Sequence, residues 1–171
     1  MGELLTLRPL AVGSFNQSTI GAGESHEGAV QEVEQDGDTS YVYAPGGGTA
    51  KIDLFTIDGN GLPPNVTINS ITVYVTAKAS GIGTPSTVAT TVKSGETTTN
   101  GGSNSLTGSY VEYSSTLPIN PGTASAWTKY DIDGLEIGYV ATPSVGMEAR
   151  VTQAYVVVDY DPTTDALFFG A

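Results

Sequence analysis

The stretch that decides the fold is Ser70-Ile-Thr-Val-Tyr-Val-Thr-Ala-Lys78. Its apolar residues fall on every second position, at Ile71, Val73, Val75 and Ala77. Because the side chains of a strand alternate between its two faces, this pattern predicts a strand with one buried face and one solvent-facing face. A helix would spread the same apolar residues around its circumference.

A second stretch, Ala149 to Tyr160, repeats this alternation near the end of the chain. Its apolar parity holds Ala154, Val156, Val158 and Tyr160, whereas Gln153 and Asp159 have the opposite parity. Two long strands that are each apolar on one face predict an antiparallel sheet whose apolar face is covered by a second sheet.

Shorter strand candidates surround these two at regular spacing. They are residues 3–7, 29–34, 39–43, 50–57, 87–93, 110–118 and 135–140. Asp36-Gly37-Asp38 is a strong turn signal and predicts a hairpin between the second and third of them. Residues 50–57 have mixed parity, which indicates a strand partly covered on both faces. Residues 11–28 and 94–108 are polar and rich in small residues, and we expect loops there.

The fold class that follows is all-β: an antiparallel two-sheet β-sandwich of jelly-roll type with nine or ten strands. The one predicted helix is short, spans residues 126–133 and has Thr128 or Ser125 as its N-terminal cap. Residues 1–160 are expected to form a single domain, followed by a C-terminal tail of residues 161–171. A chain of 171 residues is long enough to bury a core.

The composition argues against several classes of partner. Six basic and 18 acidic residues give a formal net charge of -12, and such a field repels DNA and RNA, so no nucleic-acid partner is expected. The chain has no cysteine, which excludes disulfides, thiol nucleophiles and thiolate metal sites. No apolar run approaches the roughly 20 residues of a membrane span, and residues 1–5 lack the features of a signal peptide. We therefore expect neither a membrane partner nor a signal segment.

The sequence shows no catalytic residues. His26 is the only histidine and lies in a polar loop between Glu24 and Glu27, so we interpret it as a solvated loop residue. No serine stands in a nucleophile-elbow motif. The protein is therefore expected not to be an enzyme, and calcium is the one cofactor with a candidate site.

That candidate calcium site consists of Glu34, Asp36 and Asp38. These residues alternate at a strand-to-turn junction, where oxygen ligands suit Ca²⁺. The spacing differs from that of an EF-hand loop, and Asp-Gly-Asp is also a common hairpin turn. Both interpretations stay open, with the simple turn favoured.

Trp127 also has two interpretations. An exposed ring would be a stacking platform for a sugar, with strand tyrosines such as Tyr74 adding to the binding face. A buried ring would close one end of the sandwich, with Ile132 and Leu135 following it. The second interpretation is favoured because large aromatic side chains dominate core burial.

Four segments of the chain, taken in their order, carry a resemblance to a known family. They are Asp36-Gly-Asp-Thr-Ser-Tyr-Val-Tyr43, Ile71-Thr-Val-Tyr-Val-Thr-Ala-Lys-Ala79, Ala126-Trp-Thr-Lys-Tyr-Asp-Ile-Asp-Gly-Leu-Glu-Ile-Gly138 and Arg150-Val-Thr-Gln-Ala-Tyr-Val-Val-Val-Asp-Tyr160. Together they resemble a jelly-roll module of tailed phages and their environmental relatives, which virion structural proteins usually carry. The resemblance covers most of residues 4–160. It implies a compact sandwich used for display, decoration or attachment, often as an oligomer, and it implies no catalytic residues.

The tail carries the clearest sequence signal for a partner. Pro162 ends the last strand, since proline cannot continue a ladder inside a sheet. Leu167, Phe168 and Phe169 follow, and a soluble monomer has no reason to leave two phenylalanines on a loose end. The tail either folds back on its own sandwich or docks on a neighbouring subunit as an anchor.

The expected function is that of a non-enzymatic structural protein, a virion decoration or another repeating external coat or fibre subunit. It would work as a homo-oligomer or by docking on other virion or coat proteins, on the exterior of a virion or on an extracellular surface. The alternative is a carbohydrate-binding jelly-roll module that attaches to glycans. Fold alone does not separate the two.

Overall fold

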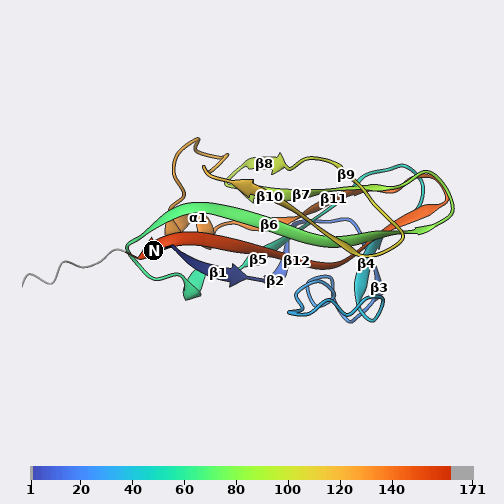
Figure 1. The fold of residues 1–171 in the computed structure, drawn as a ribbon, viewed down its shortest axis with the longest axis horizontal. Helices are drawn as coiled ribbons and strands as arrows, with labels where there is room; N and C mark the ends of the chain where they lie inside the picture. Colours follow the sequence, from blue (N-terminus) through green and yellow to red (C-terminus); the bar gives the residue numbers. More distant parts are fainter. Residues whose placement is uncertain (1, 163–171) are drawn as a thin grey trace, which may run out of the picture.

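The computed structural model describes residues 2–162 of the chain. Two strands of 16 residues, β6 (Val66–Gly81) and β12 (Met147–Pro162), pair antiparallel along their length. They run along the long axis of an elongated molecule (Figure 1). At about 3.3 Å per residue, each strand spans roughly 50 Å.

The other strands extend β6 and β12 into one sheet and form a second sheet against it. Sheet A also contains β1 (Glu3–Leu7), β3 (Thr19–Ala22), β4 (Tyr41–Ala44) and β10 (Val111–Leu117). Sheet B contains β2 (Pro9–Asn16), β5 (Lys51–Ile57), β7 (Thr87–Ser94), β8 (Thr97–Asn100), β9 (Asn104–Ser105) and β11 (Glu136–Thr142).

The path of the chain through the two sheets is that of a jelly roll. Sheet A has the order β10-β6-β12-β4-β3, with β1 also on β12, and sheet B has the order β2-β5-β11-β7-β8, with β9 on β7. From β4 to β7 the chain alternates between the sheets, then passes through β8 and returns by β10, β11 and β12. All pairings are antiparallel, and this interleaving is the double Greek key of a jelly roll. The predicted fold class is confirmed.

The alternation that predicted the long strands is present in the structure. Val73 and Val75 are fully buried, whereas Thr72 and Tyr74, which alternate with them, are half-buried on the outer face. In β12 the pairing shifts by one residue between Val151 and Gln153, which keeps Val151 and Ala154 both in the core. A bulge of this kind adds one residue without exchanging the two faces.

The strand count in residues 2–162 is twelve rather than nine or ten. The additional strands β2, β3, β8 and β9 lie mostly in segments that were expected to be loops. They pair irregularly or are short: the register of β2 shifts twice and that of β3 once, and β9 has two residues. Such strands have no clear period-two pattern for the sequence to reveal.

Residues 29–34 form turns and bends instead of the predicted strand. The backbone oxygen of Val30 accepts a 2.8 Å hydrogen bond from the Ala154 amide, in the part of β12 between its pairing with β4 and its pairing with β1. Ala29 and Val30 are fully buried there. The part of β12 between its pairings with β4 and β1 is only a few residues long, so a loop lies against it instead of a strand. The predicted hairpin is therefore wrong, and β4 pairs with β3 and β12.

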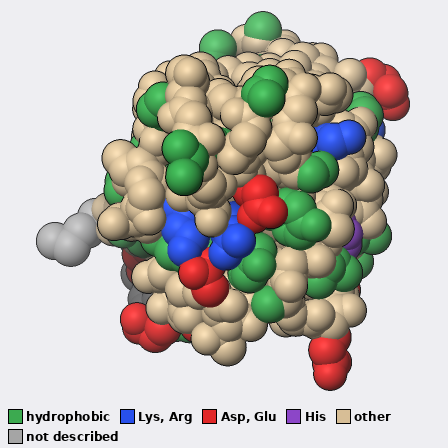
Figure 2. Space-filling view, turned by 90° about the vertical axis from the view of Figure 1, so that its right-hand side faces the viewer, with side chains coloured by type: hydrophobic (Ala, Val, Ile, Leu, Met, Phe, Trp, Pro, Cys, Tyr) green, Lys and Arg blue, Asp and Glu red, His purple; other side chains and the backbone are tan. Residues whose placement is uncertain are grey.

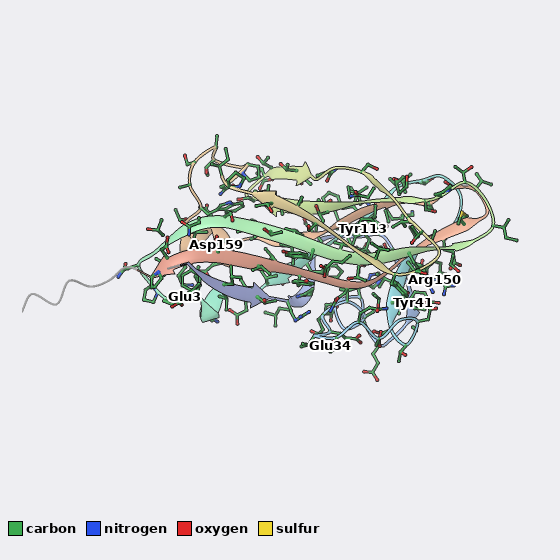
Figure 3. The ribbon with its side chains drawn as sticks, viewed as in Figure 1. Glu3, Glu34, Tyr41, Tyr113, Arg150 and Asp159 are labelled. Carbon is green, nitrogen blue, oxygen red and sulfur yellow. The ribbon has the colours of Figure 1, made fainter. Side chains whose placement is uncertain are left out.

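The core divides into two clusters along the long axis. The cluster on the side of Glu3 and Pro162 is built from large side chains, among them Leu7, Ile68, Trp127, Ile132 and Tyr160. The cluster at the other end contains seven alanines: Ala29, Ala44, Ala77, Ala79, Ala141, Ala149 and Ala154. We call the end that holds Glu3 and Pro162 the terminal pole and the opposite end, where β6 ends and β12 begins, the distal pole; Figure 3 shows Glu3 and Asp159 at the terminal pole.

The predicted helix is present as α1 (Lys129–Asp133) and begins later than expected. Thr128 caps it: its hydroxyl accepts from the Asp131 amide, and the Asp131 side chain accepts from the Thr128 amide. A 3-10 turn, η1 (Gly59–Gly61), lies against it. Within residues 2–162, no helix combines the length and apolar character that a membrane crossing requires.

Candidate functional site

The strongest candidate site is a groove on the outer face of sheet A. Its volume is about 540 Å³, which lies within the usual range of ligand pockets. It is lined by Thr6, Arg8, Val33, Glu34, Gln35, Tyr74, Glu112, Gln153, Tyr155 and Val157. We call it the tyrosine groove, because two stacked tyrosines lie at its centre.

The aromatic centre follows from the register of the strands. Tyr74 of β6 lies opposite Tyr155 of β12, and their rings stack with centroids 4.7 Å apart and planes 7° apart. The guanidinium of Arg8, one residue beyond β1, lies 5.1 Å from the Tyr155 ring centroid. Strands β6 and β12 and the residue after β1 thus place three planar groups in one row, each stabilised by its neighbour.

One wall of the groove is a loop that is tied to the sheet. Gln153 Nε2 donates hydrogen bonds of 2.8 and 3.1 Å to the backbone oxygens of Glu32 and Val33. Arg8 also donates to the Glu32 oxygen. These bonds hold the loop in place and leave the side chains of Glu34 and Gln35 exposed along the groove.

The opposite wall is Glu112 of β10. Its carboxylate accepts a 2.7 Å hydrogen bond from the Tyr155 hydroxyl. Burial, together with this carboxylate, raises the pKa of Tyr155, so the phenol stays protonated and remains a donor. The groove therefore combines an aromatic surface with carboxylate and amide groups, a set that suits a ring bearing several hydroxyl groups.

The three residues of the candidate calcium site do not form a metal site in this structure. Among residues 2–162, no group of three or more His, Cys, Asp or Glu side chains is placed to hold a metal ion. Glu34 lines the tyrosine groove, and Asp36 Oδ1 accepts from the Ser40 amide and the Thr152 hydroxyl, each at 3.3 Å. Asp36 thus stabilises a turn, although this turn does not join two strands of a hairpin.

Asp38 is bound by cations of the protein itself. Its carboxylate accepts from Lys78 Nζ at 2.5 Å, from the Tyr110 hydroxyl at 2.9 Å and from Arg150 at 3.1 Å. The hydrogen bond from Lys78, with those from Tyr110 and Arg150, lowers the pKa of Asp38 to about 2. Two of the six basic residues of the chain are used here, so the cluster needs no metal ion to balance its charge.

The cations of this cluster also contact aromatic rings. Lys78 Nζ lies 4.6 Å from the centroid of Tyr110, and the Arg150 guanidinium lies 4.6 Å from that of Tyr41. Figure 3 shows Arg150 beside Tyr41 toward the distal pole, with Glu34 apart from them. Figure 2 faces the distal pole and shows basic and acidic side chains in contact, with hydrophobic side chains around them.

Trp127 is a core residue rather than a sugar platform. Its side chain is 3% exposed and packs in the cluster that contains Ile132 and Leu135. The indole nitrogen donates a 3.0 Å hydrogen bond to the Leu117 backbone oxygen. The ring therefore has no free face for a ligand, and the favoured interpretation, a plug at one end of the sandwich, agrees with its position.

A buried polar cluster around Asp53 was not predicted. Asp53 Oδ1 accepts from the amides of Gln17 and Ser18 at 2.7 and 2.8 Å, and Asp53 Oδ2 accepts from the Tyr139 hydroxyl at 2.9 Å. His26 Nδ1 lies 3.2 Å from the same Oδ2, and the His26 side chain is only 14% exposed. The prediction of a solvated histidine is wrong, because the loop carrying His26 folds down onto β5.

The candidate anchor residues Leu167, Phe168 and Phe169 lie outside the described residues, and the docking of the tail stays a prediction. The groove could be found in part from the sequence, since Tyr74 and Tyr155 both have the outward parity. The sequence did not reveal which strands lie next to each other, and therefore it did not reveal that Arg8 stacks on Tyr155. No protein-family model matches the chain, and the search of curated proteins finds no match either.

Proposed function

We propose that this chain is a non-enzymatic structural module displayed on the outside of a particle, as a virion decoration or another repeating coat or fibre subunit. It works by association with further copies or by docking on the particle surface. The proposal is supported by the resemblance of four segments of the chain to phage jelly-roll modules. It is also supported by the difference between the terminal pole and the distal pole.

The observation that carries the proposal is that the two ends of the elongated molecule differ. Glu3 pairs with Tyr160, and Pro162 pairs with Val66. The first described strand, β1, therefore begins at the terminal pole, and the last, β12, ends there. β6 and β12 then extend along the molecule to the distal pole (Figure 1). A module held at its terminal pole would present the distal pole outward.

The distal pole has the exposed apolar residues expected of a contact surface. Ile82 is 94% exposed in the loop after β6, and Val145 is 80% exposed in the turn before β12. The two segments lie together, since a side chain at Gly81 would meet the backbone oxygen of Gly146. Exposed apolar side chains that gather on one surface commonly mark contacts with other molecules.

The test uses fractionated source material. Antibody against the purified chain should detect it in the particle fraction of a density gradient and should bind intact particles. A variant lacking residues 163–171 should remain folded by circular dichroism but rebind stripped particles less well. Ile82→Ser, which removes apolar surface from the distal pole, is the matched control and should rebind normally. Recovery of the protein only outside the particle fraction contradicts the proposal.

A second candidate function, attachment through carbohydrate, is favoured by the tyrosine groove. The stacked pair of Tyr74 and Tyr155, with Glu112 and Gln35 beside it, offers both surface and hydrogen-bonding groups to a sugar. The site that the sequence suggested for this role, Trp127, is buried, so the candidate moves to the outer face of sheet A.

Titration with neutral oligosaccharides, followed by NMR or calorimetry, tests this candidate. Tyr74→Ala should weaken binding strongly, because the stacking of a sugar on the tyrosine pair depends on the Tyr74 ring. Tyr130→Ala removes a tyrosine that is 86% exposed on α1, away from sheet A, and should leave binding unchanged. Equal effects of both substitutions, or no binding by the unmodified chain, remove this candidate.

A further inference from the structure

The free edges of the two sheets differ in how regular they are. The edge strands β2 and β3 have register shifts, and β1, β8 and β9 have five residues or fewer. β10 alone among the described edge strands combines seven residues with an unbroken register, from Val111 opposite Ala77 to Leu117 opposite Ile71. Its other side has no partner strand within residues 2–162.

β10 also lacks the features that keep an edge from pairing. Natural edge strands are blunted by lysine, proline or bulges. The sequence of β10, Val-Glu-Tyr-Ser-Ser-Thr-Leu, has none of these, and its one charged residue is Glu112. The Glu112 carboxylate is already bonded to the Tyr155 hydroxyl on β12, which directs it across the face of its own sheet.

Charge restricts the registers in which a second copy of the chain can pair with this edge. Copies of a chain with a formal net charge of -12 repel one another over most of their surface. An antiparallel pairing of two β10 strands centred on Ser114 adds no close contact between like charges to this repulsion. In that register Glu112 lies opposite Thr116 of the second copy, and Val111 lies opposite its Leu117, so no carboxylate meets its equivalent.

The side chains agree with this register. Glu112, Ser114 and Thr116 are exposed on the outer face, and Val111 is 40% exposed at the start of the strand. Leu117 is half-buried against the core and lines an opening of about 210 Å³ between β10 and β8. A second β10 would cover this opening and bring the apolar Val111 and Leu117 side chains together on the inner side.

We propose that two copies of this chain pair antiparallel through β10, with Ser114 opposite Ser114, so that sheet A continues from one copy into the other. The pairing is isologous and closes after two copies. It rests on the proposed function in that self-association is one way a displayed subunit works. It also brings the two tyrosine grooves onto one continuous sheet face.

The absence of cysteine from the chain makes the register directly testable. Residues opposite each other in an antiparallel pair have Cα atoms about 4.5–5.5 Å apart, within the roughly 4.4–6.8 Å that a disulfide requires. Ser114→Cys should therefore form a covalent dimer under mild oxidation. Thr98→Cys, exposed on the edge strand β8 of sheet B, is the matched control and should cross-link at least about tenfold more slowly.

A mixture of Glu112→Cys and Thr116→Cys should yield the mixed dimer in preference to either homodimer. In sedimentation, Ser114→Lys should raise the dimer dissociation constant at least roughly tenfold, because two like charges would face each other, and Thr98→Lys should not. Equal cross-linking at positions 114 and 98, or a dimer unaffected by Ser114→Lys, overturns the proposal. Particle binding is measured separately from dimerisation. If the protein binds particles but is monomeric, or associates through a surface other than β10, the β10 pairing is refuted and the proposed function is not.

Discussion

The hydroxyl of Tyr139 donates a 2.9 Å hydrogen bond to Asp53 Oδ2, and both residues are fully buried. Through Asp53 the bond joins β11 to β5, and the same carboxylate holds the amides of Gln17 and Ser18 after β2. One carboxylate therefore connects elements that lie far apart in the sequence.

Replacement of Asp53 by alanine should destabilise the protein strongly. It leaves the buried Tyr139 hydroxyl and two amides without their acceptor, and each buried donor left unsatisfied costs about 1–3 kcal/mol. The free energy of unfolding in urea measures this. Asp58→Ala removes an exposed carboxylate that caps η1, and should cost only about 1 kcal/mol. Similar losses in both variants would show that the buried cluster contributes little.

Stability should fall at alkaline pH. Burial raises the pKa of Tyr139 well above the value of about 10 that the unfolded chain has. Above pH 10 the unfolded state releases a proton that the folded state retains, so the free energy of unfolding decreases as pH rises toward the folded-state pKa. Phenolate absorbance and circular dichroism, recorded together, should show the Tyr139 phenol ionising only as the fold is lost. Tyr139→Phe should weaken the pH dependence in this range.

Asp38 should give the opposite dependence, in acid. Its folded-state pKa of about 2 is below the unfolded value, so its contribution is present above about pH 4 and disappears as pH falls toward 2. The difference in urea midpoint between the unmodified chain and Asp38→Asn should shrink over this range. Added salt should also reduce that difference, since the side chain is 48% exposed. A difference that is independent of pH would show that Lys78 and Arg150 do not act through the Asp38 charge.

The two faces of β6 should respond differently to the same charge. Val73→Asp places an unpaired carboxylate in the core at a fully buried position and should prevent folding. Thr72→Asp lies on the outer face, where the Thr72 hydroxyl is 2.9 Å from that of Thr116, and should cost about 1 kcal/mol. Thermal melting distinguishes them. Equal losses would imply that both faces of β6 are buried.

Gly138 should not tolerate a methyl group. A Cβ at this position in β11 would meet the backbone oxygen of Asp53 in the neighbouring strand β5. Gly138→Ala should therefore cost about 1–3 kcal/mol through overpacking. Gly102→Ala is the control, because an added Cβ there meets nothing within 4 Å. A neutral Gly138→Ala, measured by urea unfolding, would show that β5 and β11 can separate at this point.

The long strands could be predicted because burial on one face leaves a direct trace in the sequence. Val73, Val75, Val156 and Val158 are all fully buried, as their alternation requires. The mixed parity of residues 50–57 also had a structural meaning, since Leu54 and Phe55, on opposite parities, are both fully buried. Local periodicity therefore identified the strands that build the sandwich.

The rest depended on contacts between distant residues. Ala29 to Glu34 looked like a short strand before a turn signal, but its position is determined by the short gap along β12, which no local pattern encodes. His26 looked like a loop residue because its partner, Asp53, lies 27 positions away. The tyrosine groove likewise required the strand order, because Arg8, Tyr74 and Tyr155 come together only when β1, β12 and β6 lie side by side.

The shared course of β6 and β12 has a mechanical consequence. If the chain is held beyond Pro162 and a load acts on the distal pole, the pull is directed along β12. β12 is paired with β6 from Met147 to Pro162, and with β4 and β1 on its other side. The load then acts in shear on many ladder bonds at once, instead of opening them one after another. Forced unfolding is governed by the unfolding barrier, so a body tethered in this direction should withstand tension far better than one peeled apart from its N-terminal strand.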